Sequence, residues 1–260
     1  MRKSVSLLAL VALVATLPVH AGPAEDKGLT IAKEASTRDS GWADNTADLT
    51  MLLKNKQGEE SRRDMRAKTL EIPDDGDKSL MIFDTPADVK GTALLSFAHK
   101  TVDDEQWLYL PALKRVKRIA SDNKAGPFMG SEFAYEDITS QEVEKYTYKW
   151  LRDEKLGGQD VFVFERYPVD ANSGYTRQVV WMDKAAYRIQ KIDFYDRKQA
   201  LLKTLSFKDY KAYGKFWRAS DMNMVNHQTD KSTQLVWNAY KFGAGLSARD
   251  FDQNALSRAR

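Results

Sequence analysis

Apolar and polar residues alternate along most of the chain after Trp42. The clearest case is the segment YTYKWL, in which Tyr146, Tyr148 and Trp150 share one face of a strand. Turn signals such as KLGGQD and YDRKQA separate several of the runs. The pattern predicts roughly ten to twelve strands, joined mostly by hairpins, in one large antiparallel sheet. The other alternating runs are Leu49–Lys54, Met65–Leu70, Leu80–Phe83, Thr92–Phe97, Tyr175–Met182, Arg188–Tyr195, Leu201–Phe207, Met222–Val225, Thr233–Tyr240 and the segments around Trp107 and Val161.

Helical patterns are confined to the two ends of this region. Residues 25–39, EDKGLTIAKEASTRD, carry a thin apolar stripe of Leu29, Ala32 and Ala35, which predicts an amphipathic helix. The last segment, SARDFDQNALSRAR, predicts a loop and a short terminal helix.

The expected size of the sheet has a functional consequence. An open, twisted sheet of more than ~10 strands curls or splits in two. A curled amphipathic sheet turns its apolar face inward and encloses more space than its own side chains readily fill. A helix or a ligand must then cover the concave face. The aromatic content of 11% and the eight methionines suit an adaptable hydrophobic surface, although the same residues could simply form a core.

The first residues have the pattern of a secretory signal. Arg2 and Lys3 precede an apolar run that ends in the small-residue site Val19-His20-Ala21, so residues 1–21 are predicted to be a signal peptide and 22–260 one mature domain. Removing the signal leaves 38 basic and 37 acidic residues, which gives no reason to expect a nucleic-acid partner. The chain has no cysteine, and therefore no disulfide and no lipidated cysteine. We expect a soluble periplasmic protein.

Patterns typical of catalysis are missing from the sequence. There is no G-x-S-x-G elbow and no phosphate-binding glycine loop. After the signal, His99 and His227 are the remaining histidines, and they lack the spacing of metal ligands. We therefore expect no enzyme activity, no metal and no cofactor.

Three segments carry a resemblance to a known family. DTPADVKGTALLSF, QWLYLPALKRVKRI and GPFMGSEFAYEDI resemble the LolA-like outer-membrane lipoprotein-sorting proteins, and within them the branch often encoded beside RND-type (MMPL-like) exporters. The resemblance implies a mainly β fold, an unclosed β-barrel with a few covering helices.

The same resemblance implies a periplasmic carrier for lipidated or otherwise hydrophobic cargo. Its partners would be a lipoprotein or lipid, an RND/MMPL-type inner-membrane exporter and an outer-membrane acceptor. The alternative is an accessory subunit that docks on the exporter and binds no cargo of its own. The aromatic residues expected to line the cavity are Tyr146, Tyr148 and Trp150, with Trp107 and Trp181 as neighbours.

A basic cluster lies within residues 107–138, the most specific part of this resemblance. Lys114, Arg115, Lys117 and Arg118 place charge on both faces of a strand, which predicts an edge strand. The charges could simply prevent unwanted strand pairing, or they could form a rim for an anionic headgroup or an acidic partner. A third interpretation is an ion-pair network with the nearby acidic residues. Those acidic residues are Glu132, Glu136 and Asp137.

An apolar pair lies between two glycines. Phe128 and Met129 are flanked by Gly126 and Gly130, which predicts a mobile loop. Two exposed apolar side chains on such a loop would serve as a lid or a docking knob.

Overall fold

The computed structural model describes residues 22–253 and 256, so the predicted signal peptide lies outside the described residues. Within these residues the chain forms one α-helix, several short 3-10 helices and thirteen strands. The helices are α1 (Pro23–Arg38), η1 (Pro111–Leu113), η2 (Ser121–Asn123), η3 (Phe128–Gly130), η4 (Tyr135–Asp137), η5 (Val143–Lys145) and η6 (Ala248–Phe251). The strands are β1 (Asp44–Lys54), β2 (Glu60–Leu70), β3 (Lys78–Thr85), β4 (Ala93–Phe97), β5 (Glu105–Leu110), β6 (Arg115–Ile119), β7 (Tyr146–Leu156), β8 (Gln159–Pro168), β9 (Tyr175–Asp183), β10 (Ile189–Asp196), β11 (Leu201–Tyr213), β12 (Phe216–Asn226) and β13 (Lys231–Phe242).

All thirteen described strands belong to one antiparallel sheet in the order β6-β5-β4-β3-β2-β1-β13-β12-β11-β10-β9-β8-β7. The order is that of two meanders, β1 to β6 and β7 to β13, which join where β1 pairs with β13. The edge strands β6 and β7 do not pair with each other, so the barrel is unclosed. The predicted mainly β, unclosed barrel is confirmed, with one strand more than the upper predicted number.

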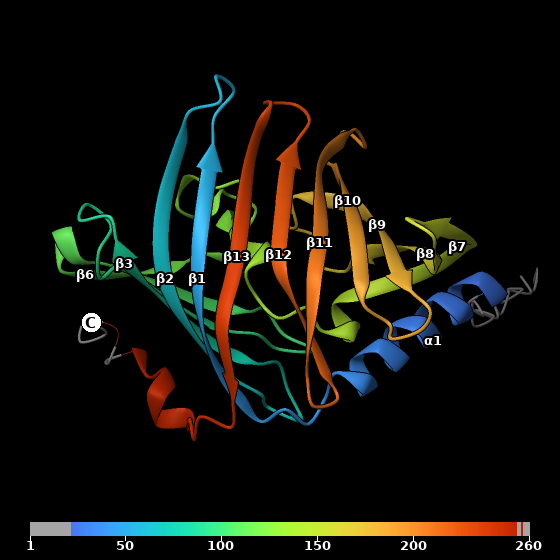
Figure 1. The fold of residues 1–260 in the computed structure, drawn as a ribbon, viewed down its shortest axis with the longest axis horizontal. Coiled ribbons are helices and arrows are strands. Elements are labelled where there is room, and N and C mark those ends of the chain that lie inside the picture. Colours follow the sequence, from blue (N-terminus) through green and yellow to red (C-terminus); the bar gives the residue numbers. More distant parts are fainter. Residues whose placement is uncertain (1–21, 254–255, 257–260) are drawn as a thin grey trace, which may run out of the picture.

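The sheet is strongly curved (Figure 1), and buried apolar residues cluster on both of its faces. The large cluster on the concave face includes Met51, Phe83, Val180 and Met224. Two smaller clusters lie on the other face of the sheet. One contains Leu95, Trp107, Phe251 and Leu256, and the other contains Val161, Val163, Val179 and Trp181. Alternation along the strands separates these sets, because successive side chains point to opposite faces.

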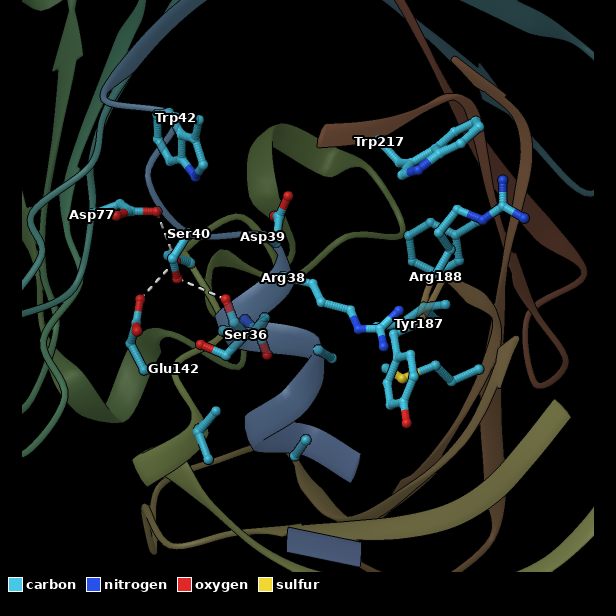
Figure 2. A pocket seen from close by; sticks show the side chains of 18 of the residues that line it. Ser36, Arg38, Asp39, Ser40, Trp42, Asp77, Glu142, Tyr187, Arg188 and Trp217 are labelled. Atoms are coloured by element: carbon cyan, nitrogen blue, oxygen red, sulfur yellow. Dashed lines mark hydrogen bonds between the residues drawn. The ribbon is translucent and has the colours of Figure 1, made fainter. Parts of the chain in front are cut away.

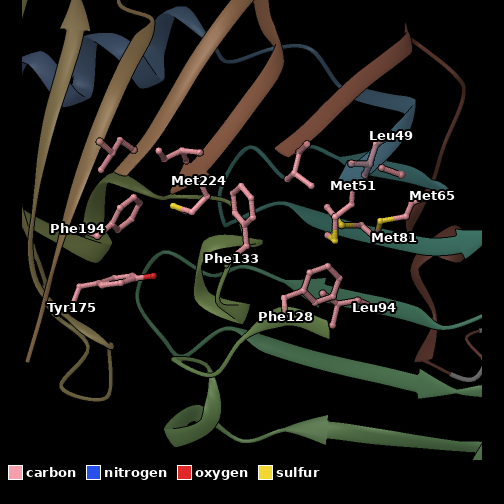
Figure 3. Packing of buried hydrophobic residues seen from close by; sticks show 14 of the residues in the cluster. Leu49, Met51, Met65, Met81, Leu94, Phe128, Phe133, Tyr175, Phe194 and Met224 are labelled. Atoms are coloured by element: carbon pink, nitrogen blue, oxygen red, sulfur yellow. The ribbon is translucent and has the colours of Figure 1, made fainter. Parts of the chain in front are cut away.

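The connection from β6 to β7, residues 120–145, lies inside the curve of the sheet; we call it the plug. In Figure 3 its Phe128 and Phe133 stand among buried side chains of the strands. Phe133 is 1% exposed, and the Phe128 ring lies 5.8 Å from that of Phe83 on β3. The plug therefore supplies apolar side chains that the concave face cannot supply by itself.

Helix α1 lies against β7 at the opposite edge of the sheet from β6 (Figure 1). It begins with Pro23 in the first turn, followed by Glu25 and Asp26, which suit the positive end of a helix. Gly28 permits the close approach, because a Cβ there would lie 2.9 Å from the backbone nitrogens of Lys149 and Trp150. The predicted helix at 25–39 is confirmed within two residues at each end.

The segment after β13 packs on the other face of the sheet. Its short helix η6 places Phe251 against the strand residues Leu80 and Leu95. No helix in the described ranges combines the length and the apolar composition needed to cross a bilayer.

Candidate functional site

A cavity of about 1010 Å³ lies between the concave face, α1 and the loops at one end of the sheet. Strands β7 to β12 provide its apolar wall, and Ala32 and Ala35 of α1 face this wall. Most side chains of this wall are buried, and those of Phe207 and Met222 are half-buried. The wall consists of Tyr148, Phe164, Met182, Ile192, Phe194, Leu205, Phe207 and Met222.

The entrance to the cavity is polar and aromatic (Figure 2). The Arg38 guanidinium lies 4.3 Å from the centre of the Tyr187 ring, and that of Arg188 lies 4.5 Å from the Trp217 ring. Arg188 also donates from Nε to Asp183 at 2.8 Å, so its charge is paired. Cations stacked on aromatic faces hold these side chains in place around the opening.

Two carboxylates meet one hydroxyl at the entrance. The Ser140 hydroxyl lies 2.7 Å from Glu142 Oε1 and 3.2 Å from Asp77 Oδ2. Burial, with a further contribution from the Glu142 charge, raises the pKa of Asp77 to about 7. A hydroxyl has one proton to donate, so a neutral Asp77 can donate to Ser140 while Ser140 donates to Glu142. The contact fastens the plug to the start of β3.

A row of mostly polar residues, here called the polar row, crosses the concave face of the sheet, and three of its members, Tyr148, Arg166 and Phe194, line the cavity. Strand register puts six concave-face residues side by side, each opposite the next on the neighbouring strand. In order from β7 to β12 they are Tyr148, Arg166, Gln178, Phe194, Lys203 and Asn226. Two cations are thus buried in one apolar face.

Lys203, one of these two cations, is neutralised by the plug. Its Nζ donates to Asp137 Oδ2 at 2.8 Å and to the Glu132 carbonyl oxygen at 2.9 Å. Tyr175 donates its hydroxyl to Asp137, and Asn226 donates to the Glu132 carboxylate at 2.6 Å. Burial, together with the negative charge of Asp137, raises the pKa of Tyr175 and keeps its hydroxyl protonated as a donor.

Arg166, the other cation, has no carboxylate partner among the described residues. It is 8% exposed and lines the cavity. Its Nε donates to Gln178 Oε1 at 2.7 Å, and its guanidinium lies 4.5 Å from the centre of the Tyr146 ring. The ion pairs found within residues 22–253 do not include it.

The three aromatic residues of YTYKWL share the concave face, as their alternation predicted. Tyr148 lines the cavity and donates its hydroxyl to the Val143 carbonyl oxygen at 3.0 Å. Tyr146 and Trp150 pack against the same apolar cluster but do not line the cavity. Tyr146 stacks on Arg166, and Trp150 lies under Lys27 of α1 at 3.5 Å.

Trp107 and Trp181 were predicted as cavity neighbours, and this prediction is wrong. Trp107 packs with Leu95 and Phe97 on the opposite face, and Trp181 packs with Val161 and Val163 there. The strand period places Leu108 and Met182, next to them in the sequence, on the concave face instead.

The glycine-flanked pair is not an exposed lid or knob. Phe128 is 0% exposed and contacts Phe83 and Tyr135, so that part of the prediction is wrong. Met129 is half-buried, and its carbonyl oxygen accepts a 2.6 Å hydrogen bond from Arg63. The pair forms the centre of the plug because apolar side chains are stabilised where the sheet excludes water.

Three residues of the basic cluster lie on an edge strand, as predicted, whereas Lys114 precedes this strand at the end of η1, with a φ of 47°. Lys114, Arg115, Lys117 and Arg118 are all exposed, and β6 is the last strand of the sheet. None of them lines the cavity, so they do not form a rim around it. The predicted network with plug acids is also wrong, since Arg118 pairs with Glu105 at 2.9 Å.

The plug acids that the network required have other partners. Glu136 accepts hydrogen bonds from Ser173 at 2.7 Å and from the Gly174 backbone at 2.9 Å. Burial, with the nearby charge of Asp137, raises the pKa of Glu136. Asp137 and Glu132 hold Lys203 and Asn226.

Sequence reasoning did not single out the residues that give the cavity its polarity. The next strand, β8, alternates in the same way, so that Phe162, Phe164 and Arg166 share a face. This pattern could have placed Arg166 on the concave face with Tyr148. No comparable signal exists for Asp77 and Ser140, which are brought together by the path of the plug.

Known proteins give the context for this arrangement. A family model described as that of an uncharacterised protein matches residues 75–258. A domain from Vibrio parahaemolyticus, named for outer membrane lipoprotein sorting, is 60% identical with a TM-score of 0.89, over 90% of this chain and 100% of that chain. A search of curated proteins gives no match.

Two further solved structures are similar over most of the chain. A DUF1329 family protein from Desulfovibrio piger is 28% identical with a TM-score of 0.85, over 90% of this chain and 99% of that one. A LolA superfamily protein from Nitrosomonas europaea shares the fold, with 18% identity and a TM-score of 0.70, over 87% of this chain and 98% of that one.

The sheet, its plug and its open cavity define a LolA-like half-barrel. The matched family model and the 60% identical relative identify the family: the chain belongs to the outer-membrane lipoprotein-sorting proteins, and it is similar to the DUF1329 family protein.

Proposed function

We propose that the protein is a periplasmic carrier that holds the acyl chains of a lipid or a lipidated protein in its cavity. The observation that carries this proposal is the open apolar wall of β7 to β12, around a cavity of about 1010 Å³. This volume is at the upper end of the roughly 300–1,000 Å³ found for small-molecule sites. Burial of an acyl chain against such a wall gains ~25 cal/mol per Å² of apolar surface.

The destination and partners are part of the same proposal. The secretory pattern of residues 1–21 supports export to the periplasm, and the name of the 60% identical relative supports a role in lipoprotein sorting. The resemblance to the exporter-associated branch supports an RND-type exporter as the donor and an outer-membrane acceptor as the target. Transfer of a bound lipid requires no bond to be made or broken, so the proposal contains no catalytic step.

The test is native mass spectrometry of protein purified from cells, followed by lipid extraction. We expect co-purifying lipid on the wild type and much less on Ala35→Trp, which places a large ring at the cavity. Lys33→Trp is the matched control, because it adds the same ring to an exposed position of the same helix. A wild-type protein that carries no lipid, or an Ala35→Trp variant that carries as much as wild type, would contradict the proposal.

A specific observation supports the accessory subunit as a second candidate. The basic cluster is exposed at edge strand β6 and does not line the cavity, and Leu113 and Val116 beside these charges are 66% and 37% exposed. An unpaired, basic edge with apolar side chains suits an acidic protein partner. Reversing the four charges to Glu should slow association with the exporter at low salt and leave lipid content unchanged. Equal rates of association with the exporter for the wild type and the charge-reversed variant would exclude this candidate.

A further inference from the structure

We propose that the cavity selects an anionic lipid and that Arg166 binds its charged headgroup. This inference rests on the proposed carrier function and names the class of cargo. The supporting observation is a cation that is 92% buried, lines the cavity and has no ion-pair partner in the described part of the chain.

The polar row supplies an internal comparison for this assignment. Arg166 and Lys203 lie on the same concave face, separated by Gln178 and Phe194. The plug brings a carboxylate to Lys203, at 2.8 Å from Asp137. It brings none to Arg166, whose hydrogen bond to Gln178 uses Nε and leaves both terminal nitrogens without a hydrogen-bond partner among the described residues. A buried charge without a partner is costly, so the site is complete only when an anion is present.

Two buried acidic side chains of the plug already have other partners. Glu136 accepts from Ser173 and Gly174, and Asp137 accepts from Lys203, Tyr175 and the Ala134 backbone. Neither carboxylate forms a hydrogen bond with Arg166. The guanidinium therefore remains available to a ligand that enters the cavity.

The surroundings of Arg166 favour one orientation of that ligand. Tyr146 stacks on the guanidinium and Gln178 fixes its Nε, so the two terminal nitrogens present a rigid fork. The apolar wall continues from Arg166 through Phe164, Met182 and Ile192. An acyl chain would lie along this wall with its charged head at Arg166.

A carboxylate and a phosphate both match the fork of a guanidinium, whereas a hydroxyl or an ester gives no ion pair. The shared chemistry is thus an acyl chain with a compact anionic head. A fatty acid and a phosphate-bearing lipid are the two sources of such a ligand. Acyl chains joined only through uncharged ester and amide groups, as on a lipidated protein, would leave Arg166 unpaired.

The experiment compares three ligands with the same sixteen-carbon chain: palmitate, hexadecyl phosphate and hexadecanol. Delipidated mature protein is loaded with N-phenyl-1-naphthylamine, an uncharged fluorescent probe, and each ligand is titrated as a competitor. We expect at least one anion to bind wild type roughly tenfold or more tightly than the alcohol, as charge-assisted hydrogen bonds imply. The tighter of the two anions identifies a carboxylate or a phosphate as the natural head.

Variants of Arg166 and Arg177 distinguish anion binding at Arg166 from a general attraction of the ligand to positive charge on the protein. Arg166→Met should bind hexadecanol as wild type does and lose the preference for the anion, to within about twofold. Arg166→Gln, which retains a hydrogen-bonding group, provides the same reading if the Met variant is unstable. Arg177→Met is the matched control, because Arg177 lies on the other face of β9, pairs with Glu165 at 2.9 Å and does not line the cavity. It should keep the full preference.

The outcomes distinguish this inference from the carrier function itself. Equal binding of all three ligands to wild type, or an unchanged anion preference in both Arg166 variants, overturns the inference and leaves the carrier function standing. Loss of the preference in Arg177→Met also overturns it, because the preference would then follow net charge. If none of the ligands displaces the probe and native protein carries no lipid, both proposals fail.

Discussion

The concave face of the sheet has two halves that differ in what covers them. Over β1 to β5 the plug fills the curve, and Phe128 and Phe133 make that half a dry core. Over β7 to β12 the same kind of apolar face lines a cavity of about 1010 Å³. Whether an apolar sheet face becomes a core or a binding site therefore depends on the path of one connection, residues 120–145.

The two buried cations show the same division at the level of single side chains. Lys203 lies at the boundary and is paired by the plug residue Asp137, whereas Arg166 lies in the open half and has no carboxylate partner in the described chain. The cation that the plug reaches is satisfied by the protein. The cation in the open half is left for the ligand proposed above.

The largest expected effect comes from removing an aromatic ring from each half. Phe128→Ala should lower the free energy of unfolding by about 3–5 kcal/mol, because it leaves a closed void in a dry core. Phe207→Ala should cost about 1 kcal/mol or less, because its ring already faces open space in the cavity and leaves no closed void. Urea unfolding of both variants measures the difference. Equal losses would show that the two halves are packed alike.

The next effect tests the two cations. Lys203→Met should cost about 2–4 kcal/mol, because it leaves the buried Asp137 carboxylate without its cation. Arg166→Met should stay within about 1 kcal/mol of wild type in the absence of ligand, since it strands no opposite charge. Thermal melting of delipidated protein compares them. A larger loss for Arg166→Met would mean that its charge is satisfied inside the protein.

A smaller effect is expected at the fastening of the plug near the cavity entrance. The pKa of Asp77 is raised from 3.8 to about 7, so the unfolded chain ionises this group at lower pH than the folded protein does. The stability that neutral Asp77 contributes is thus present below about pH 4 and is lost as the pH rises to about 7. Asp77→Asn, neutral throughout, should gain on the order of 1 kcal/mol over wild type between pH 4 and 8. Parallel pH profiles for the two proteins would contradict this assignment.

Much of the fold followed from the sequence because alternation reports strands directly. The runs around Met65, Val161 and Leu201 all became strands, and Tyr146 and Tyr148 share a face as predicted. Alternation shows which residues share a face but not which face is concave. Both faces of β5 and β9 carry apolar side chains, so Trp107 and Trp181 were placed on the wrong one.

The site was predicted less well because the plug decides it. Gly126 and Gly130 suggested a mobile loop around Phe128, whereas anchors from six strands hold the segment. These anchors join residues up to 101 positions apart, such as Glu132 and Thr233, so no local pattern could reveal them. The exposed basic edge was predictable, because charge on both faces of a short strand is incompatible with burial.

The smallest expected effect compares ion pairs at the two ends of the plug. Arg118, just before it, pairs with Glu105 at 2.9 Å, with side chains 65% and 36% exposed. Lys145, its last residue, pairs with Asp104 at 2.6 Å, with side chains 19% and 13% exposed, and also donates to the Val102 carbonyl oxygen. Arg118→Gln should change the free energy of unfolding by less than about 0.5 kcal/mol, because solvent already screens the exposed pair. Lys145→Gln should cost about 1 kcal/mol, because Asp104 would keep its charge with less water around it. Urea unfolding at low and high salt checks both, and only the small Arg118 effect should vanish in high salt. A loss of unfolding free energy in Arg118→Gln as large as that in Lys145→Gln would mean that the exposed edge strand β6 also helps to hold the plug in place.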